Sequence, residues 1–296
     1  MRRPDAQAAR AGLVITLQAL RNADGGWPYY RGKLSRLEPT CWALLGADMA
    51  LATTPLARWA GADALLVEPA TGQVNYAFNA LAALAAGAQD AAPAMTRGII
   101  GGLLAVKGVV IERTPVIEQD TSLQGWSWTP GTFTWVEPTA WCMLALKRWP
   151  GEPGPTQARL RDAARVMRDR ACREGGWNFG NSVVYGNALP AHVPPTAIGL
   201  LAMQDQRTDP IVTAAVGHLE RHALIEGSTT ALALSALALL AVGRPADAVV
   251  DALVARSAEA DVTSNAAVLG MAACALGAAA PGGLPAALAL STVATA

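Results

Sequence analysis

Residues 137–146 read EPTAWCMLAL, a helix start followed by an almost uncharged helix body. An earlier copy at residues 38–47 reads EPTCWALLGA, and a later copy at residues 194–203 reads PPTAIGLLAM. Proline suits the first turn of a helix because its missing N–H is not needed there. The three copies therefore predict three equivalent helices, each beginning at a glutamate-proline or proline-proline pair.

A glycine-tryptophan loop precedes each copy and ends at Trp27, Trp126 or Trp177. The first two tryptophans are 99 positions apart and the last two are 51 positions apart. One structural unit therefore takes about 50 residues, a period that is typical of arrays of helical hairpins.

The composition bounds the class of protein. Of 296 residues, 52% are hydrophobic and 16% are charged, and 23 basic residues balance 23 acidic ones. A net charge of zero gives no electrostatic footprint for nucleic acid, so we expect no nucleic-acid partner. Four cysteines without CxxC spacing and an N-terminus without a signal peptide predict a cytoplasmic protein with reduced thiols. Residues 262–296 carry no charge, which leaves peripheral contact with a membrane open.

Mixed and apolar helical segments alternate six times along the chain. A helix that is apolar all round is surrounded by protein, whereas a one-sided helix faces water. The mixed segments are 4–22, 55–66, 94–106, 156–172, 209–223 and 245–257. The apolar segments are 38–51, 74–86, 137–148, 194–204, 228–242 and 263–277.

Six buried helices paired with six half-exposed ones predict an all-α fold, an (α/α)6 toroid that spans residues 1–296 as one domain. An open solenoid would need polar repeats at both ends, and the last repeat here is among the least polar. The long connections at 23–37, 107–136 and 173–193 contain aromatic residues, so we expect them to be ordered over one mouth of the ring. Residues 108–113 are the only candidate strand.

The Gly-x-Trp loops and the Pro-Thr-Ala-Trp-x-x-Leu-Ala-Leu helix resemble the repeats of the terpene cyclase and protein prenyltransferase superfamily, squalene–hopene cyclases among them. The resemblance implies the toroid and implies that Trp27, Trp126 and Trp177 wedge between neighbouring hairpins. The Asp-x-Asp-Asp acid motif of those cyclases is missing, and Glu118-Gln119-Asp120 is the nearest sequence. The Asp-x-Cys zinc ligands of the prenyltransferases are also missing. We expect neither a metal nor a cofactor, and function has to be argued from the site.

Three carboxylates are candidate catalytic residues. Asp120 lies in a long loop and can serve as a general acid if a dry pocket raises its pKa, or it is a turn residue. Glu38 and Glu137 stand at equivalent helix starts, where unpaired N–H groups and the helix dipole favour a carboxylate as a cap. The same stabilisation predicts that both stay ionised, as bases or as partners of a cation.

Aromatic and amide side chains are the candidate substrate contacts. Aromatic faces suit an apolar chain, a carbocation or a sugar ring. Two asparagines of the second apolar helix share one face, and either line the cavity or tie neighbouring helices together. The candidates are Trp42, Asn75, Asn79, Trp128, Phe133, Trp135, Trp141 and Tyr185.

These features predict a terpenoid cyclase-like protein that binds a hydrophobic small molecule, a polyprenyl or triterpenoid chain, in a central apolar cavity. Cyclisation would begin with protonation. Two alternatives stay open at this stage. One is a non-catalytic isoprenoid-binding or interaction module, which the missing acid motif favours. The other is a carbohydrate-active enzyme on the same ring, with two carboxylates about 5–10 Å apart across an open groove.

Overall fold

Helices dominate the protein, as the sequence predicts for an all-α fold. A computed structural model describes residues 3–47, 55–88, 93–114, 116–280 and 283–290. Six apolar helices, here called the inner helices, begin within three residues of the predicted positions. They are α2 (Leu37–Ala47), α3 (Tyr76–Ala88), α5 (Val136–Arg148), α7 (Val193–Met203), α9 (Thr229–Ala241) and α12 (Ala266–Ala278).

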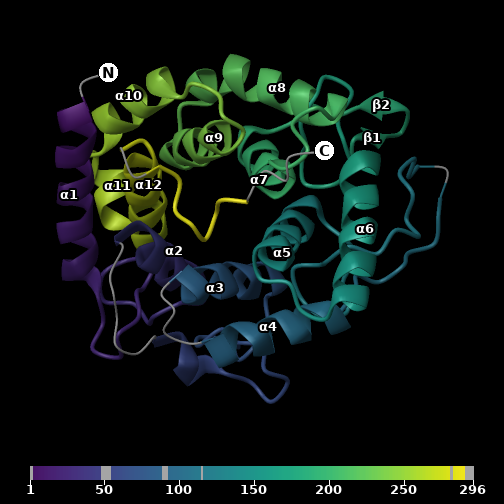
Figure 1. Ribbon diagram of the computed structural model, residues 1–296, viewed down its shortest axis with the longest axis horizontal. Helices are drawn as coiled ribbons and strands as arrows, with labels where there is room; N and C mark the ends of the chain where they lie inside the picture. The colour runs from purple at the N-terminus through teal and green to yellow at the C-terminus, as the bar shows by residue number, and fades with distance from the viewer. Residues whose placement is uncertain (1–2, 48–54, 89–92, 115, 281–282, 291–296) are drawn as a thin grey trace.

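The remaining helices lie outside the inner ones (Figure 1). Their polar faces carry charged residues, as in the amphipathic α6, and their apolar faces pack on the inner helices. They are α1 (Arg3–Leu20), α4 (Pro93–Ala105), α6 (Pro153–Asp169), α8 (Pro210–Glu226), α10 (Asp247–Arg256) and the short α11 (Ala260–Ser264).

Each inner helix packs on the next one along the chain, and the last returns to the first. The contacts run from α2 through α3, α5, α7 and α9 to α12, and α12 packs on α2. Figure 1 shows this arrangement around a common centre. The α12–α2 contact is very close, because a Cβ at Gly270 would lie 2.5 Å from the carbonyl carbon of Trp42. Glycine at this position therefore permits the first and last inner helices to meet.

The predicted outer helix over 55–66 is wrong. Only a 3-10 turn, η1 (Pro55–Trp59), forms there, and Ala60 then pairs with Leu66 in an extended bridge. The cause lies in α3, where the Asn79 side chain binds both backbone polar groups of Leu66, at 2.7 and 2.9 Å. Those bonds replace the helical ones that Leu66 would otherwise make.

Three tryptophan loops join an outer helix to the next inner helix in the same way. Each tryptophan is fully buried, its indole N–H donates to a carbonyl of the outer helix, and its backbone N–H donates to a threonine hydroxyl of the inner helix. The indole bonds are Trp27 to Leu17 (2.7 Å), Trp126 to Leu103 (2.9 Å) and Trp177 to Met167 (2.7 Å). The hydroxyl bonds are Trp27 to Thr40 (2.9 Å), Trp126 to Thr139 (3.0 Å) and Trp177 to Thr196 (2.9 Å). The three tryptophans therefore join the outer and inner helix of one unit, and their wedging between neighbouring hairpins stays a prediction.

The residue two positions after each tryptophan caps the inner helix of a neighbouring unit. Trp128 accepts a backbone hydrogen bond from Tyr76 at the start of α3, and Phe179 accepts one from Val136 at the start of α5. By the same rule Tyr29, in the first loop, accepts one from Ala266 at the start of α12. The first loop therefore caps the last inner helix, and this hydrogen bond links the two ends of the chain.

The other ends of the inner helices are covered by residues 283–290. The Gln204 side chain, just after α7, donates to the Leu288 carbonyl at 2.8 Å and accepts from the Leu290 N–H at 3.0 Å. Arg148, at the end of α5, donates to the Ala286 carbonyl at 2.7 Å. Leu288 is fully buried. In the described ranges, no helix combines the length and apolar character needed to cross a bilayer.

The two longest connections lie against each other beside α6. Ile117 pairs with Val184 in an isolated bridge, and strands β1 (Val183–Val184) and β2 (Asn187–Ala188) form a hairpin. The candidate strand at 108–113 contributes only one bridge, between Val109 and Phe133. These loops therefore contact one another through isolated bridges, and the β1–β2 hairpin is the sheet formed within the described residues of the two loops.

Candidate functional site

The first turns of α2 and α5 bring two glutamates to the same end of the inner helices. Glu38 is the second residue of α2, and Glu137 is the second residue of α5. Trp135 precedes α5, and no side chain caps that helix, so Glu137 is not used as a cap. Both carboxyls are partly buried and are held inside the protein.

Glu38 and Glu137 belong to an acid cluster, defined here as Tyr29, Arg36, Glu38, Glu68 and Glu137. The Tyr29 hydroxyl donates a short hydrogen bond to Glu38. Arg36 pairs with Glu68 at 2.6 Å, and its guanidinium lies 5.5 Å from the centre of the Tyr29 ring. Glu68 pairs directly with Arg36, the charge of Arg36 also acts on Glu38, and the charge that acts on Glu137 is that of Glu38. The cluster would hold excess negative charge if all three carboxyls were ionised.

Burial and this shortage of cations raise the pKa of both glutamates. Burial raises the pKa of Glu137 to about 7, the charge of Glu38 adds to the increase, and a hydrogen bond with Trp141 opposes it. Burial also raises the pKa of Glu38, against the lowering effect of the Tyr29 hydrogen bond. The pKa of both glutamates therefore shifts in the direction opposite to the one expected from the helix ends, because desolvation raises it.

Two tryptophans fill the space below the glutamates. Trp42 and Trp141 stand four residues after Glu38 and Glu137, one helical turn deeper, and their rings meet edge to face with centroids 5.7 Å apart. Their exposed fractions are 1% and 4%. At this level the two rings fill the space between the inner helices instead of lining an open cavity. A substrate that entered between them would have to displace them.

The aromatic side chains at the second position after each loop tryptophan surround the same end. Tyr29 belongs to the acid cluster, Trp128 packs edge to face on Phe78 of α3 at 6.2 Å, and Phe179 lies 5.5 Å from His192. Sequence reasoning selected Trp128 but missed Tyr29. The signal was present as a Trp-x-aromatic triplet in all three loops, at 27–29, 126–128 and 177–179.

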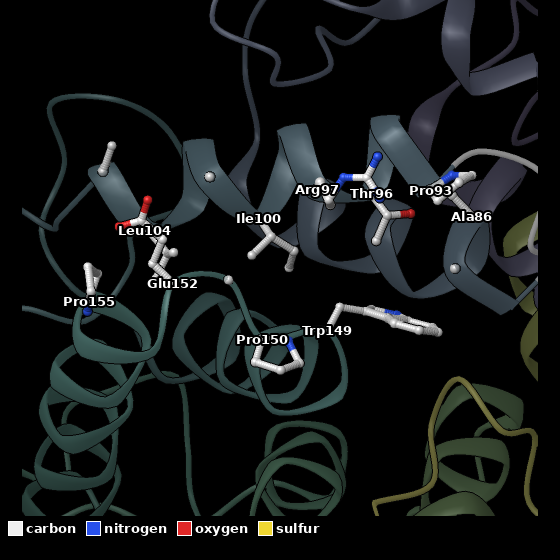
Figure 2. Close-up of a pocket in the computed structure, with 14 residues that line it drawn as sticks. Ala86, Pro93, Thr96, Arg97, Ile100, Leu104, Trp149, Pro150, Glu152 and Pro155 are labelled. Atoms are coloured by element: carbon white, nitrogen blue, oxygen red, sulfur yellow. The ribbon is translucent and has the colours of Figure 1, made fainter.

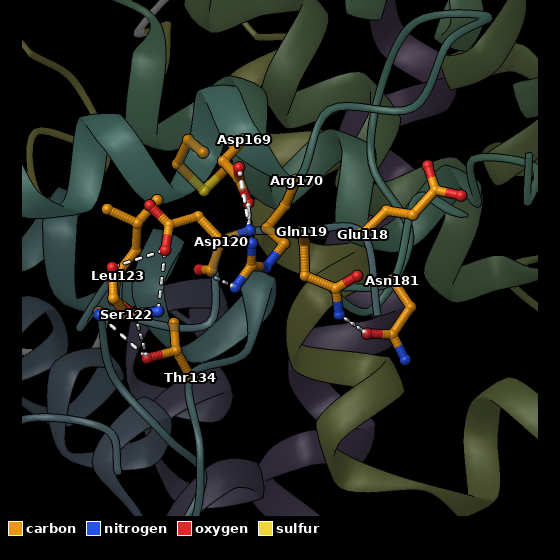
Figure 3. Close-up of polar contacts among 12 residues, drawn as sticks. Glu118, Gln119, Asp120, Ser122, Leu123, Thr134, Asp169, Arg170 and Asn181 are labelled. Atoms are coloured by element: carbon orange, nitrogen blue, oxygen red, sulfur yellow. Dashed lines mark hydrogen bonds and ion pairs between the residues drawn. The ribbon is translucent and has the colours of Figure 1, made fainter. Parts of the chain in front are cut away.

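Asp120 lies elsewhere, in the loop beside α6 (Figure 3). Its carboxylate accepts hydrogen bonds from the Ser122 hydroxyl at 2.6 Å and the Ser122 N–H at 2.9 Å. These bonds lower the pKa of Asp120. Its backbone carbonyl accepts from Arg170, whose guanidinium also pairs with Asp169. The dry pocket that a general acid needs is absent around Asp120 within the described structure.

Phe133 and Trp135 line a cavity of about 300 Å³ between the two long loops, and no acid-cluster residue lines it. Their rings stack with centroids 4.9 Å apart. Arg170, which is 4% exposed, lines the same cavity. Tyr185 lies in the turn between β1 and β2, is 74% exposed and does not line this cavity. Trp135 stands two positions before Glu137 in the chain, yet its ring belongs to this cavity and stacks on Phe133.

Neither a model of a known protein family nor a curated protein sequence matches the chain. The family resemblance therefore stays a hypothesis, and the argument for function depends on the geometry of the acid cluster.

The two asparagine candidates have structural roles. Asn79 is fully buried and its amide is occupied by the backbone of Leu66 and Asn75. It takes the place in α3 that Thr40 and Thr139 take in their helices. Asn75 accepts from the Phe78 N–H at 2.9 Å, as a helix cap does. Asn79 therefore ties α3 to the extended segment at Leu66, and not to a neighbouring helix or to a cavity as the sequence analysis left open.

Proposed function

We propose that the chain is an (α/α)6 toroid of the terpene cyclase and protein prenyltransferase type, with residues 1–296 as one domain. Three observations support this. The inner helices contact one another in a closed order, the loop at Tyr29 caps α12, and most of the buried apolar side chains, from Ala6 to Leu288, belong to one cluster.

Within this fold we propose a terpenoid cyclase-like activity on a polyprenyl or triterpenoid chain, with Glu137 as the proton donor. The observation that carries the proposal is the pKa of Glu137, raised to about 7 by burial, next to the rings of Trp42 and Trp141. A carboxylic acid whose pKa lies near neutrality keeps a proton to give and can take one back. Asp120, whose pKa is lowered, takes no part in the proposed chemistry.

The proposed step transfers the Glu137 proton to one carbon of a substrate double bond and leaves a tertiary cation on the other carbon. The Glu137 carboxylate formed in this step and the charge of Glu38 then stabilise the cation, together with the aromatic faces. Loss of a proton from the cyclised cation to Glu137 restores the acid. The reaction is thus an isomerisation, and atoms and charge balance without a cofactor.

One observation favours the non-catalytic alternative. Trp42 and Trp141 close the centre of the inner helices, and an apolar chain has to displace a ring to reach Glu137 from that side. A protein that only carries an isoprenoid does not need such an opening. The alternative predicts binding of isoprenoids without any product.

The test is incubation with squalene, farnesyl diphosphate and geranylgeranyl diphosphate, followed by gas chromatography with mass spectrometry. Cyclised product is expected from the wild type and from Asp120→Asn, and none from Glu137→Gln. Equal turnover by Glu137→Gln and wild type would remove Glu137 from the mechanism. Binding of a probe without product would select the carrier alternative, and no binding by any of the three would reject both functions.

A further inference from the structure

A larger cavity lies on the outer side of the inner helices, between α4 and the connection from α5 to α6 (Figure 2). Its volume is about 880 Å³. This is in the range of about 300–1,000 Å³ that holds small-molecule ligands in proteins. None of the acid-cluster residues lines it. The cavity is therefore a separate feature of the molecule and does not depend on the proposed cyclase activity.

The distance to the acid cluster follows from α5 itself. Glu137 lies in the first turn of α5, and Trp149 follows the last residue of the same helix. At 1.5 Å per residue, these positions are about 18 Å apart along the helix axis. A ligand in the cavity therefore does not touch Glu137.

The walls of the cavity are mainly apolar. Ile100 and Leu104 of α4 face Trp149 and Pro150 across it (Figure 2). The Trp149 ring is fixed on both sides. It lies against Gly87 of α3, where any Cβ would overlap the indole, and the Arg148 guanidinium stacks 4.1 Å from the ring centre. A fixed aromatic wall and aliphatic side chains suit a long hydrocarbon chain.

The polar groups of the cavity are divided between its two ends (Figure 2). Near the start of α4, Thr96 is 5% exposed, and its hydroxyl has no hydrogen-bond partner in the described structure. Arg97 beside it is exposed and makes no ion pair with any described residue. Glu152 lines the opposite end, so a second anion there is repelled. An anionic head group is favoured only at the Thr96–Arg97 end, which is also the positive end of the α4 dipole.

We propose that this cavity binds one linear apolar chain with an anionic head group, the chain between α4 and Trp149 and the head at Arg97. A fatty carboxylate and an isoprenoid diphosphate share this chemistry. Burying the chain provides most of the affinity, in proportion to the apolar area removed from water. The charge at Arg97 fixes the direction in which the chain lies.

The test is isothermal titration calorimetry with palmitate and farnesyl diphosphate, and with the neutral alcohols hexadecanol and farnesol. The blocking variant is Gly101→Leu, because Gly101 lines the cavity and a Cβ there meets no atom within 4 Å. Gly12→Leu on α1 is the matched control, since Gly12 is also exposed in a helix with free space around it and does not line the cavity. Both variants replace a helical glycine by a better helix former, so stability is not reduced.

Gly101→Leu is expected to weaken binding of the favoured anion at least about tenfold, and Gly12→Leu to leave it unchanged. Arg97→Gln is expected to weaken the anion by about tenfold, the value of one charge-assisted contact, and to leave the matching alcohol unchanged. Tighter binding of palmitate would identify the ligand as a fatty carboxylate, and tighter binding of farnesyl diphosphate would identify it as an isoprenoid diphosphate. Equal binding by Gly101→Leu and wild type, or no binding of either anion by wild type, would overturn the proposal.

Glu137→Gln separates this site from the proposed cyclase site. The variant is expected to bind the anion as the wild type does, because Glu137 lies at the other end of α5. A loss of binding in Glu137→Gln alone would place the ligand at the acid cluster and overturn the cavity assignment.

Discussion

The polar groups on the two sides of the first turn of α5 differ in how they are paired. On one side, the Thr139 hydroxyl accepts from the Trp126 N–H at 3.0 Å and donates to the Trp135 carbonyl at 2.6 Å. On the other side, Glu137 shares a cation-poor cluster with Glu38, and its pKa rises to about 7. A group whose hydrogen bonds are all made holds the fold, whereas a buried acid without a cation is ready to exchange a proton.

The largest expected effect is on the side that holds the fold. Trp126→Ala removes a fully buried indole and its bond to Leu103, so the free energy of unfolding should fall by about 3–5 kcal/mol. Urea unfolding followed by circular dichroism measures this loss. Trp128→Ala, at a half-buried ring two residues later, should cost clearly less. Equal losses in the two variants would contradict the view that the loop tryptophans join the repeats.

The next effect is on the acid side and depends on pH. The folded protein binds the Glu137 proton more tightly than the unfolded chain, in which the pKa has its ordinary value of 4.5. The free energy of unfolding should therefore fall as pH rises from 4.5 through about 7, by at most about 3 kcal/mol. Urea unfolding across this pH range measures the slope. Glu137→Gln should flatten it, and an unchanged slope in that variant would show that Glu137 is not the group that titrates.

A smaller loss of stability is expected when only the hydroxyl of Thr139 is replaced. Thr139→Val keeps the shape of the side chain but leaves the buried Trp126 N–H without an acceptor, which should cost about 1–3 kcal/mol at every pH. Urea unfolding at two pH values, below and above the Glu137 pKa, tests this. If the cost changed with pH, the two sides of the turn would be coupled and the comparison would need revision.

The smallest effect is expected at Asp120. Its pKa is lowered by Ser122, so its contribution to stability is present above the ordinary value of 3.8 and is lost as pH falls, opposite in sign to that of Glu137. Asp120→Asn keeps an oxygen that can accept from Ser122. Stability near neutral pH should change by less than about 1 kcal/mol, as at other surface positions, in the same urea experiment. A loss comparable with that of Trp126→Ala would show that the negative charge of Asp120 beside Arg170 holds the loops together.

Most helix starts in the repeat were predictable because they depend on residues close together in the sequence. Proline before an apolar run fixed the starts of α2, α5 and α7 to within one residue, and alternation of mixed and apolar segments separated outer from inner helices. The failure at 55–66 has a tertiary cause. Leu66 is held by Asn79, and no local pattern in 55–66 records that bond.

The candidate site was only partly predictable. Glu38 and Glu137 were selected from their equivalent places in the repeat, but the direction of their pKa shifts was predicted wrongly. Each shift depends on burial and on a carboxylate from another part of the chain, Glu68 for Glu38 and Glu38 for Glu137. Tyr29 was missed because its hydrogen bond to Glu38 crosses the loop.

The sequence by itself determined which segments are helices and which of them are surrounded by protein, since hydrophobic periodicity and proline placement act within a few residues. Only the tertiary structure decided what surrounds each ionisable group. Glu137 and Asp120 are both carboxylates within 18 positions of each other in the chain, yet one is desolvated by neighbouring helices and the other is hydrogen-bonded by Ser122. Desolvation and charge pairing depend on neighbours in space, and the packing of the helices provides them.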